Sequence, residues 1–174
     1  MLSTILAIAI GLFFIFALGT LAYASFSAAP WVPLFKRDIM RMIALARVKP
    51  DDVIYDIGCG DGRVLIQVVK LTGAKAIGFE ISLIPYLIAL LRVRLAGLAS
   101  KIDIKYQNFY LADFSQANII ISFLTPMAMK KLEPKIKKEL GSTARFLSYA
   151  FPLPNIKPKL VDKPHEKLAK IFLY

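Results

Sequence analysis

The sequence has very few of the side chains that hold metals or cross-link a fold. Its 174 residues include one cysteine, Cys59, and one histidine, His165. A single cysteine excludes an internal disulfide framework, and so few soft ligands argue against a zinc or iron site. We therefore expect a protein of a reducing compartment that holds no metal.

Charge is missing from the beginning of the chain, since no Asp, Glu, Lys, Arg or His precedes Lys36. The run Ile5–Ala24 contains 20 uncharged residues, and as a helix it would span roughly 30 Å, the thickness of a bilayer's hydrocarbon core. We expect residues 1–24 to form a single-pass transmembrane anchor. A cleaved signal peptide is the alternative, because Ala22-Tyr23-Ala24 has the form of a cleavage site. The length of the run and the lack of a preceding Lys or Arg favour the uncleaved anchor.

Positive charge dominates the remaining residues. The chain carries 23 Lys and Arg against 12 Asp and Glu, a net charge of +11, all of it within residues 36–174. Basic residues directly after the anchor predict a cytoplasmic domain by the positive-inside rule. An anionic lipid surface is the simplest partner for such a domain. The lysines of residues 130–138 have few aromatic neighbours to stack bases, so no nucleic acid is expected, and a solvated helix face explains them at least as well.

Past the anchor, apolar strands alternate with helices. Residues 25–35 contain two prolines around Trp31 and are typical of a linker, and residues 36–174 form the predicted domain. Strands are predicted at 53–57, 74–79, 101–106, 117–123 and 144–150, with two more around 159–162 and 167–173, and helices at 38–47, 63–71, 82–98 and 126–140. This alternation predicts an α/β fold with a parallel sheet and helices on both faces. The alternating apolar residues of 101–106 suit an edge strand.

Three glycines, Gly58, Gly60 and Gly62, follow the first predicted strand. Glycine allows positive φ and lets a ligand lie directly on the backbone, and the amides that open the next helix can face a negative group. Glu80 follows Gly60 by 20 residues and closes the second predicted strand, a position from which a carboxylate reaches a ribose. Together these features indicate an adenosine ligand.

The charges of the loop favour S-adenosylmethionine over a dinucleotide. Arg63 stands where the third glycine of a dinucleotide fingerprint belongs, and Asp61 would repel a pyrophosphate. S-adenosylmethionine carries an ammonium and a sulfonium but no phosphate, so it suits an acidic loop. Each carboxylate also has a structural interpretation, Asp61 as a helix N-cap and Asp56 as an acceptor for loop amides. The combination at this spacing favours the cofactor.

The segment Tyr55–Gly62 (YDIGCGDG) resembles the first motif of the class I methyltransferases, and Glu80 resembles their second-strand acid. This resemblance implies a Rossmann-like, seven-stranded sheet that binds S-adenosylmethionine. Asn108 stands where most relatives carry an aspartate. The resemblance assigns the methionine part to Asp56, Gly58, Gly60 and Asp61, the ribose to Glu80, and the adenine to Ile81, Asn108 and Phe109.

A narrower resemblance covers essentially the whole chain. The anchor followed by Pro30–Pro33 (PWVP), Phe123–Pro126 (FLTP) and Phe151–Pro154 (FPLP) resembles the membrane-anchored lysine methyltransferases of the ATP synthase c subunit and the adenine nucleotide translocase. It implies a membrane-bound enzyme that N-methylates a lysine of a small integral membrane protein. Under this resemblance the acceptor channel is lined by Trp31, Phe123 and Thr125.

Other functions stay open at this point. Asn118–Pro126 lacks the Asn/Asp-Pro-Pro-Tyr form of the amide and nucleobase methyltransferases, which argues against those substrates. An N-methyltransferase of a lipid or small-molecule amine fits the same features. So does a non-catalytic module that binds S-adenosylmethionine or nucleic acid.

Overall fold

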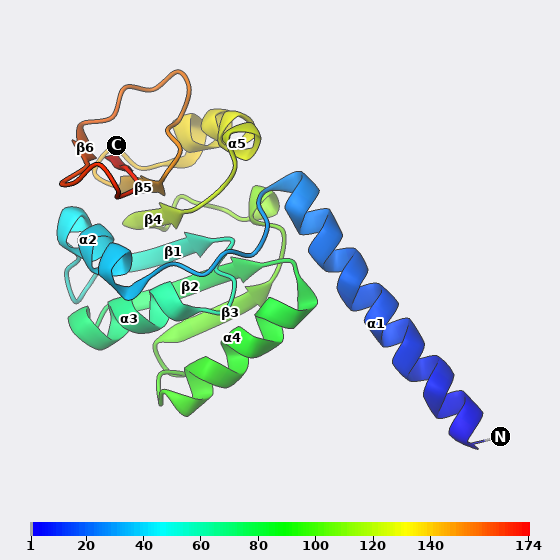
Figure 1. Cartoon of the computed structure of the whole chain (residues 1–174). Helices are drawn as coiled ribbons and strands as arrows, with labels where there is room; N and C mark the ends of the chain where they lie inside the picture. The colour runs from blue at the N-terminus through cyan, green and yellow to red at the C-terminus, as the bar shows by residue number, and fades with distance from the viewer. Residues whose placement is uncertain (1) are drawn as a thin grey trace.

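The computed structural model describes residues 2–174, in which a long helix is joined to an α/β domain (Figure 1). Helix α1, Leu2–Ser27, is continuous over 26 residues. Its length and apolar composition suffice to cross a membrane. Figure 1 shows most of α1 projecting from the domain, with the N-terminus at its far end.

The domain is built on a seven-stranded sheet in the order β3-β2-β1-β4-β5-β7-β6. Its strands are β1 Val53–Ile57, β2 Lys75–Glu80, β3 Ile102–Tyr106, β4 Ile119–Ser122, β5 Arg145–Tyr149, β6 Leu160–Asp162 and β7 Ile171–Leu173. Neighbouring strands among β3, β2, β1, β4 and β5 are parallel, as predicted. By contrast, β7 runs antiparallel to both β5 and β6, because β6 and β7 form a hairpin whose loop is too short for a crossover helix.

Helices cover both faces of the sheet, as the alternation predicted. The helices are α2 Lys36–Ala46, α3 Arg63–Thr72, α4 Leu83–Leu95 and α5 Pro126–Glu139, with a 3₁₀ turn, η1, at Phe109–Leu111. Buried side chains of α2, α3 and α4 share one core with the sheet, and those of α5 share a second core on the opposite face. The fully buried β4 lies inside the sheet, and β3, with its alternating burial, lies at the edge. The prediction of an edge strand is confirmed.

The segment between α1 and α2 is packed rather than free. The Thr20 hydroxyl oxygen near the end of α1 accepts a hydrogen bond from the Leu83 amide at 3.0 Å. The Ala28 carbonyl accepts hydrogen bonds from the Thr125 amide and hydroxyl at 3.1 and 2.7 Å. Ala28 and Leu34 are buried. The end of α1 and the predicted linker are therefore held against the domain, and the division of the chain at residues 24 and 35 stays a prediction.

Candidate functional site

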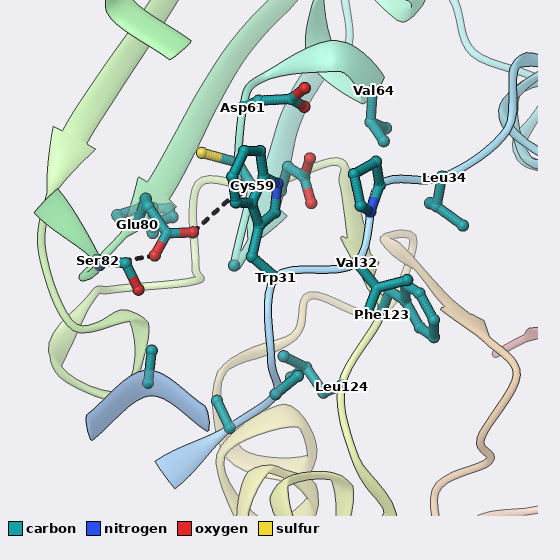
Figure 2. Close-up of a pocket in the computed structure, with 18 of the residues that line it drawn as sticks. Trp31, Val32, Leu34, Cys59, Asp61, Val64, Glu80, Ser82, Phe123 and Leu124 are labelled. Atoms are coloured by element: carbon teal, nitrogen blue, oxygen red, sulfur yellow. Dashed lines mark hydrogen bonds between the residues drawn. The ribbon is translucent and has the colours of Figure 1, made fainter. Parts of the chain in front are cut away.

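A cavity of about 80 Å³ lies beyond the carboxyl ends of β1, β2 and β4 (Figure 2). It is lined by seven of the eight residues that the sequence assigned to the cofactor, Asp56, Gly58, Gly60, Asp61, Glu80, Ile81 and Phe109. Phe123, assigned to the acceptor channel, lines it too. Ala24, in the last turn of α1, and Ala28, directly after it, also line the cavity, and the sequence did not predict this contribution.

The glycine loop has the backbone geometry that its sequence predicted. Gly58, Gly60 and Gly62 have φ angles of 83°, 55° and 73°, values at which residues with a Cβ are strained. The loop packs closely on β2, because a Cβ on Gly78 would lie only 2.7 Å from the sulfur of Cys59. The glycine in β2 thus gives the loop the room it needs.

The Glu80 carboxylate connects this loop to the end of β2. It accepts hydrogen bonds from the amides of Gly60 at 2.9 Å, Ile81 at 2.9 Å and Ser82 at 2.7 Å. Figure 2 marks hydrogen bonds of this carboxylate with dashed lines. A carboxylate offers about four acceptor positions, so one position remains for a donor such as a ribose hydroxyl.

The Asp56 side chain is buried beside the cavity with an unpaired oxygen. Among residues 2–174, its Oδ2 has no hydrogen-bond partner. Burial, together with the negative charges of Glu80 and Asp61, raises the pKa of Asp56 to about 8. A buried oxygen without a partner is costly, and a cationic donor in the cavity would satisfy it. The ammonium of S-adenosylmethionine is a donor of this kind.

Asp61 differs from expectation because its charge is already paired. Arg63 donates hydrogen bonds to the Asp61 carboxylate from Nε at 3.0 Å and from Nη2 at 2.8 Å, and Arg92 donates from Nη1. Burial acts to raise the pKa of Asp61, but the hydrogen bonds from Arg63 and the charge of Arg92 lower it below its usual value. Asp61 is therefore not a free negative charge waiting for a cation. Its contact with the cofactor stays a prediction.

Two predicted site residues do not line the cavity, Asn108 and Thr125. The Asn108 Oδ1 accepts a hydrogen bond from the Tyr110 amide at 3.0 Å and caps η1. The Thr125 hydroxyl oxygen accepts one from the Ala128 amide at 3.3 Å and caps α5. Polar side chains directly before a helix satisfy its free amides. The structure thus gives both residues capping roles, and their contacts with adenine and acceptor stay predictions.

Trp31 lines the same cavity as Phe123, with its indole against the glycine loop, and its part in an acceptor channel stays a prediction. A Cβ on Gly60 would lie 2.8 Å from Trp31 Cδ1. Figure 2 shows the indole ring on the side that carries Glu80 and Asp61. The cavity of about 80 Å³ is far below the roughly 300 Å³ of a small ligand pocket. A nucleoside therefore needs more room than this cavity offers, and we expect the indole, which lies against Gly60, to move when the ligand binds.

Binding of S-adenosylhomocysteine should change the fluorescence of Trp31, the only tryptophan of the chain. We expect a saturable change in emission, because the ligand displaces the ring from Gly60. A titration followed by calorimetry measures binding of the ligand, and the same titration followed by fluorescence measures displacement of the indole. Heat of binding without any change in emission would contradict the displacement. Homocysteine, which lacks the adenosine, is the matched control and should leave the emission unchanged.

Comparison with known proteins gives matches to sequences and to a solved structure. Residues 56–160 match the family model of the ANTKMT methyltransferase domain. A protein-lysine N-methyltransferase of Saccharolobus islandicus (strain REY15A) is 36% identical over 135 residues, which cover 77% of this chain and 84% of that protein. A protein of Homo sapiens, named as the lysine N-methyltransferase of the ATP synthase c subunit, is 30% identical over 131 residues, 74% of this chain but only 54% of the human protein.

The structural match extends over most of the chain. An RNA methyltransferase from Salinibacter ruber, solved in complex with S-adenosyl-L-homocysteine, has a TM-score of 0.79 at 29% sequence identity. The match covers 82% of this chain and 92% of that one. The fold thus has a counterpart in a protein that was solved with S-adenosyl-L-homocysteine, the demethylated form of the cofactor.

Proposed function

Since the chain belongs to the family of ANTKMT methyltransferase domains, which use S-adenosylmethionine, we propose that it N-methylates a lysine of a small integral membrane protein. The observation that carries this proposal is the place where helix and site join: Ala24, in the last turn of α1, and Ala28, directly after α1, line the cofactor cavity. A site that begins where a membrane-spanning helix ends lies within reach of side chains at the bilayer surface.

The proposal takes α1 as a single-pass anchor, with the domain in the cytoplasm. Length and composition allow α1 to span a bilayer, and the basic residues that follow it favour the cytoplasmic side. An anchored domain meets membrane proteins at a much higher effective concentration than soluble ones. Membrane acceptors are therefore favoured.

The residues around the cavity suit transfer of a methyl group to an amine. S-adenosylmethionine, when bound, would supply the methyl group for transfer to the amine and leave as S-adenosylhomocysteine. Phe123 and Leu124 present an apolar wall to the alkyl stem of the lysine. Phe123 is held by an edge-on contact with Tyr149, with ring centroids 4.8 Å apart. Holding a neutral amine at attack distance is the main task of such a site, and no dedicated base is needed if the lysine sheds its proton to solvent beforehand.

Lysine is favoured over the other acceptors by the names of the relatives. Both the archaeal and the human relative are named as lysine N-methyltransferases, and the human one is named for the ATP synthase component that it modifies. The Salinibacter ruber protein is named as an RNA methyltransferase, so RNA is the alternative that the experiment must separate.

Labelling of native membranes tests the proposal. The purified full chain is incubated with tritiated S-adenosylmethionine and membranes from cells that lack the gene, and carbonate extraction checks its anchoring. We expect label in a small membrane protein that proteases remove and ribonucleases do not, with mass spectrometry locating it on a lysine. A Glu80→Ala variant is the inactive control. Label that is extracted with lipids, or that ribonuclease releases, would overturn the choice of acceptor.

A further inference from the structure

Helix α4 exposes a stripe of leucines to the outside of the domain. Leu87, Leu91 and Leu95 are 45%, 58% and 78% exposed, and their spacing of four residues places them on one side of the helix. The side toward the sheet is buried through Pro85, Ala89 and Val93. A stripe of large apolar side chains left open on a helix marks a contact surface.

This leucine stripe belongs to the helix that meets α1. The amide of Leu83, the first residue of α4, donates a hydrogen bond to the Thr20 hydroxyl oxygen of α1 at 3.0 Å. Figure 1 shows α4 on the side of the domain from which α1 projects, and the two helices diverge from the point where they meet. A bilayer crossed by α1 would therefore lie next to α4.

Basic residues stand at the end of the stripe. Arg94, in the last turn of α4, and Lys101, just after the helix, are exposed, whereas Arg92 already pairs with Asp61. Leucines flanked by exposed cations are typical of helices that lie in the interface of an anionic membrane.

The lysine-rich helix α5 is less suited to the same contact. Lys135 pairs with Glu139 and Lys137 with Glu133, each at 2.7 Å. In addition, α5 lies on the other side of the domain from α4 (Figure 1). Of the two surfaces, α4 is the one that combines apolar side chains with a position beside the anchor.

We propose that the exposed side of α4 lies on the surface of an anionic bilayer, with its leucine stripe between headgroups and acyl chains. The proposal rests on the anchoring of α1 and adds a second, separate contact. A single helix could still tilt and rotate in the bilayer together with the domain that is packed on its end, and a second contact holds the domain in one orientation. Because Ile81 and Ser82, just before α4, line the cofactor cavity, this orientation fixes the height of the site above the membrane.

Spin labels on introduced cysteines test the contact in the full chain. The one native cysteine, Cys59, is buried, so a thiol placed on the surface is labelled selectively. Leu87→Cys and Leu91→Cys report on α4. Leu160→Cys, on β6, is the matched control because Leu160 and Leu87 are both 45% exposed. Leu12→Cys, within α1, reports separately on the anchor.

The labelled proteins are inserted into vesicles of phosphatidylcholine and phosphatidylglycerol. The measurement is the ratio of collisions with oxygen, which enters lipid, to collisions with a water-soluble nickel chelate. We expect this ratio to be several-fold higher for the α4 labels than for the Leu160 control, and highest for the label at position 12. Vesicles of phosphatidylcholine alone should reduce the difference, because the exposed Arg94 and Lys101 lose their anionic partners.

The outcomes separate this inference from the proposed anchoring. If the label at position 12 lies in lipid and the α4 labels collide freely with the chelate, α4 does not contact the bilayer and the inference is wrong. Shielding of the α4 labels from both reagents would indicate a protein partner or a second copy and would also overturn it. A water-exposed label at position 12 would instead remove the anchor, and with it both proposals.

Discussion

Replacing Glu80 by alanine should weaken binding of S-adenosylmethionine roughly 100-fold, a loss of about 3 kcal/mol. The Glu80 carboxylate accepts hydrogen bonds from three backbone amides, including that of Gly60 in the glycine loop. Alanine removes this connection between loop and strand together with the acceptor position left for the ribose. The variant therefore loses both the direct contact with the ribose and the hydrogen bond that orders the glycine loop. Calorimetric titration with S-adenosylhomocysteine measures the loss.

A second buried glutamate provides the matched control. Glu133 of α5 is also buried, accepts a hydrogen bond from the Asn155 amide at 2.8 Å and pairs with Lys137. It does not line the cavity. Glu133→Ala is thus expected to lower the melting temperature while leaving affinity for the cofactor unchanged. If both variants lost affinity equally, the effect of Glu80 would be one of general stability, and an unchanged affinity in Glu80→Ala would refute its assigned role.

Affinity for S-adenosylmethionine should rise with pH and level off above about pH 8, the pKa to which burial and the charges of Glu80 and Asp61 raise Asp56. Below this pH the Asp56 carboxyl is protonated in the free protein. The cofactor's ammonium favours the ionised form, so binding releases a proton. The dissociation constant then falls by up to about tenfold for each unit of pH. Titrations at several values on both sides of pH 8 measure this slope.

The Asp56→Asn variant distinguishes titration of the Asp56 carboxyl from titration of other groups as the cause of the pH dependence. Asparagine has no charge to gain, so we expect the pH dependence to flatten and the affinity above pH 8 to fall. Stability of the ligand-free protein supplies a second readout. A carboxyl whose folded pKa is raised stabilises the fold at low pH, and this contribution is lost as the pH rises from 3.8 through about 8. A variant that kept the native pH profile would show that another group is responsible.

Much of the fold follows from short-range patterns in the sequence. The β-branched run 53–57 became β1 with the same limits, and the other strands agree within a few residues. The spacing of apolar residues indicates whether one face or both faces of a strand or helix are buried, and this spacing can be read from residues close together in the sequence. The glycine loop was predictable for the same reason, because positive φ is a property of single residues. The residues of this loop, and those that directly follow a strand, therefore line the cavity as expected.

The pairing of side chains was decided only by the tertiary structure. The arginine at position 63 was visible in the motif, but no local pattern brings Arg92, 31 residues after Asp61, onto the same carboxylate. Nor does a local pattern place the indole of Trp31 against Gly60. The amides that Asn108 and Thr125 cap, by contrast, lie only two and three residues further along the chain.

The sequence by itself thus determined the class of fold, the cofactor loop and an apolar first helix, because each depends on the spacing of residues within one element. The contacts between elements were decided by the tertiary structure. It set the end of α1 into the cofactor cavity and left the leucine stripe of α4 exposed beside α1. Hydrogen bonds and packing between distant segments depend on how whole helices and strands are placed in space. The residue pattern within one element does not specify that placement.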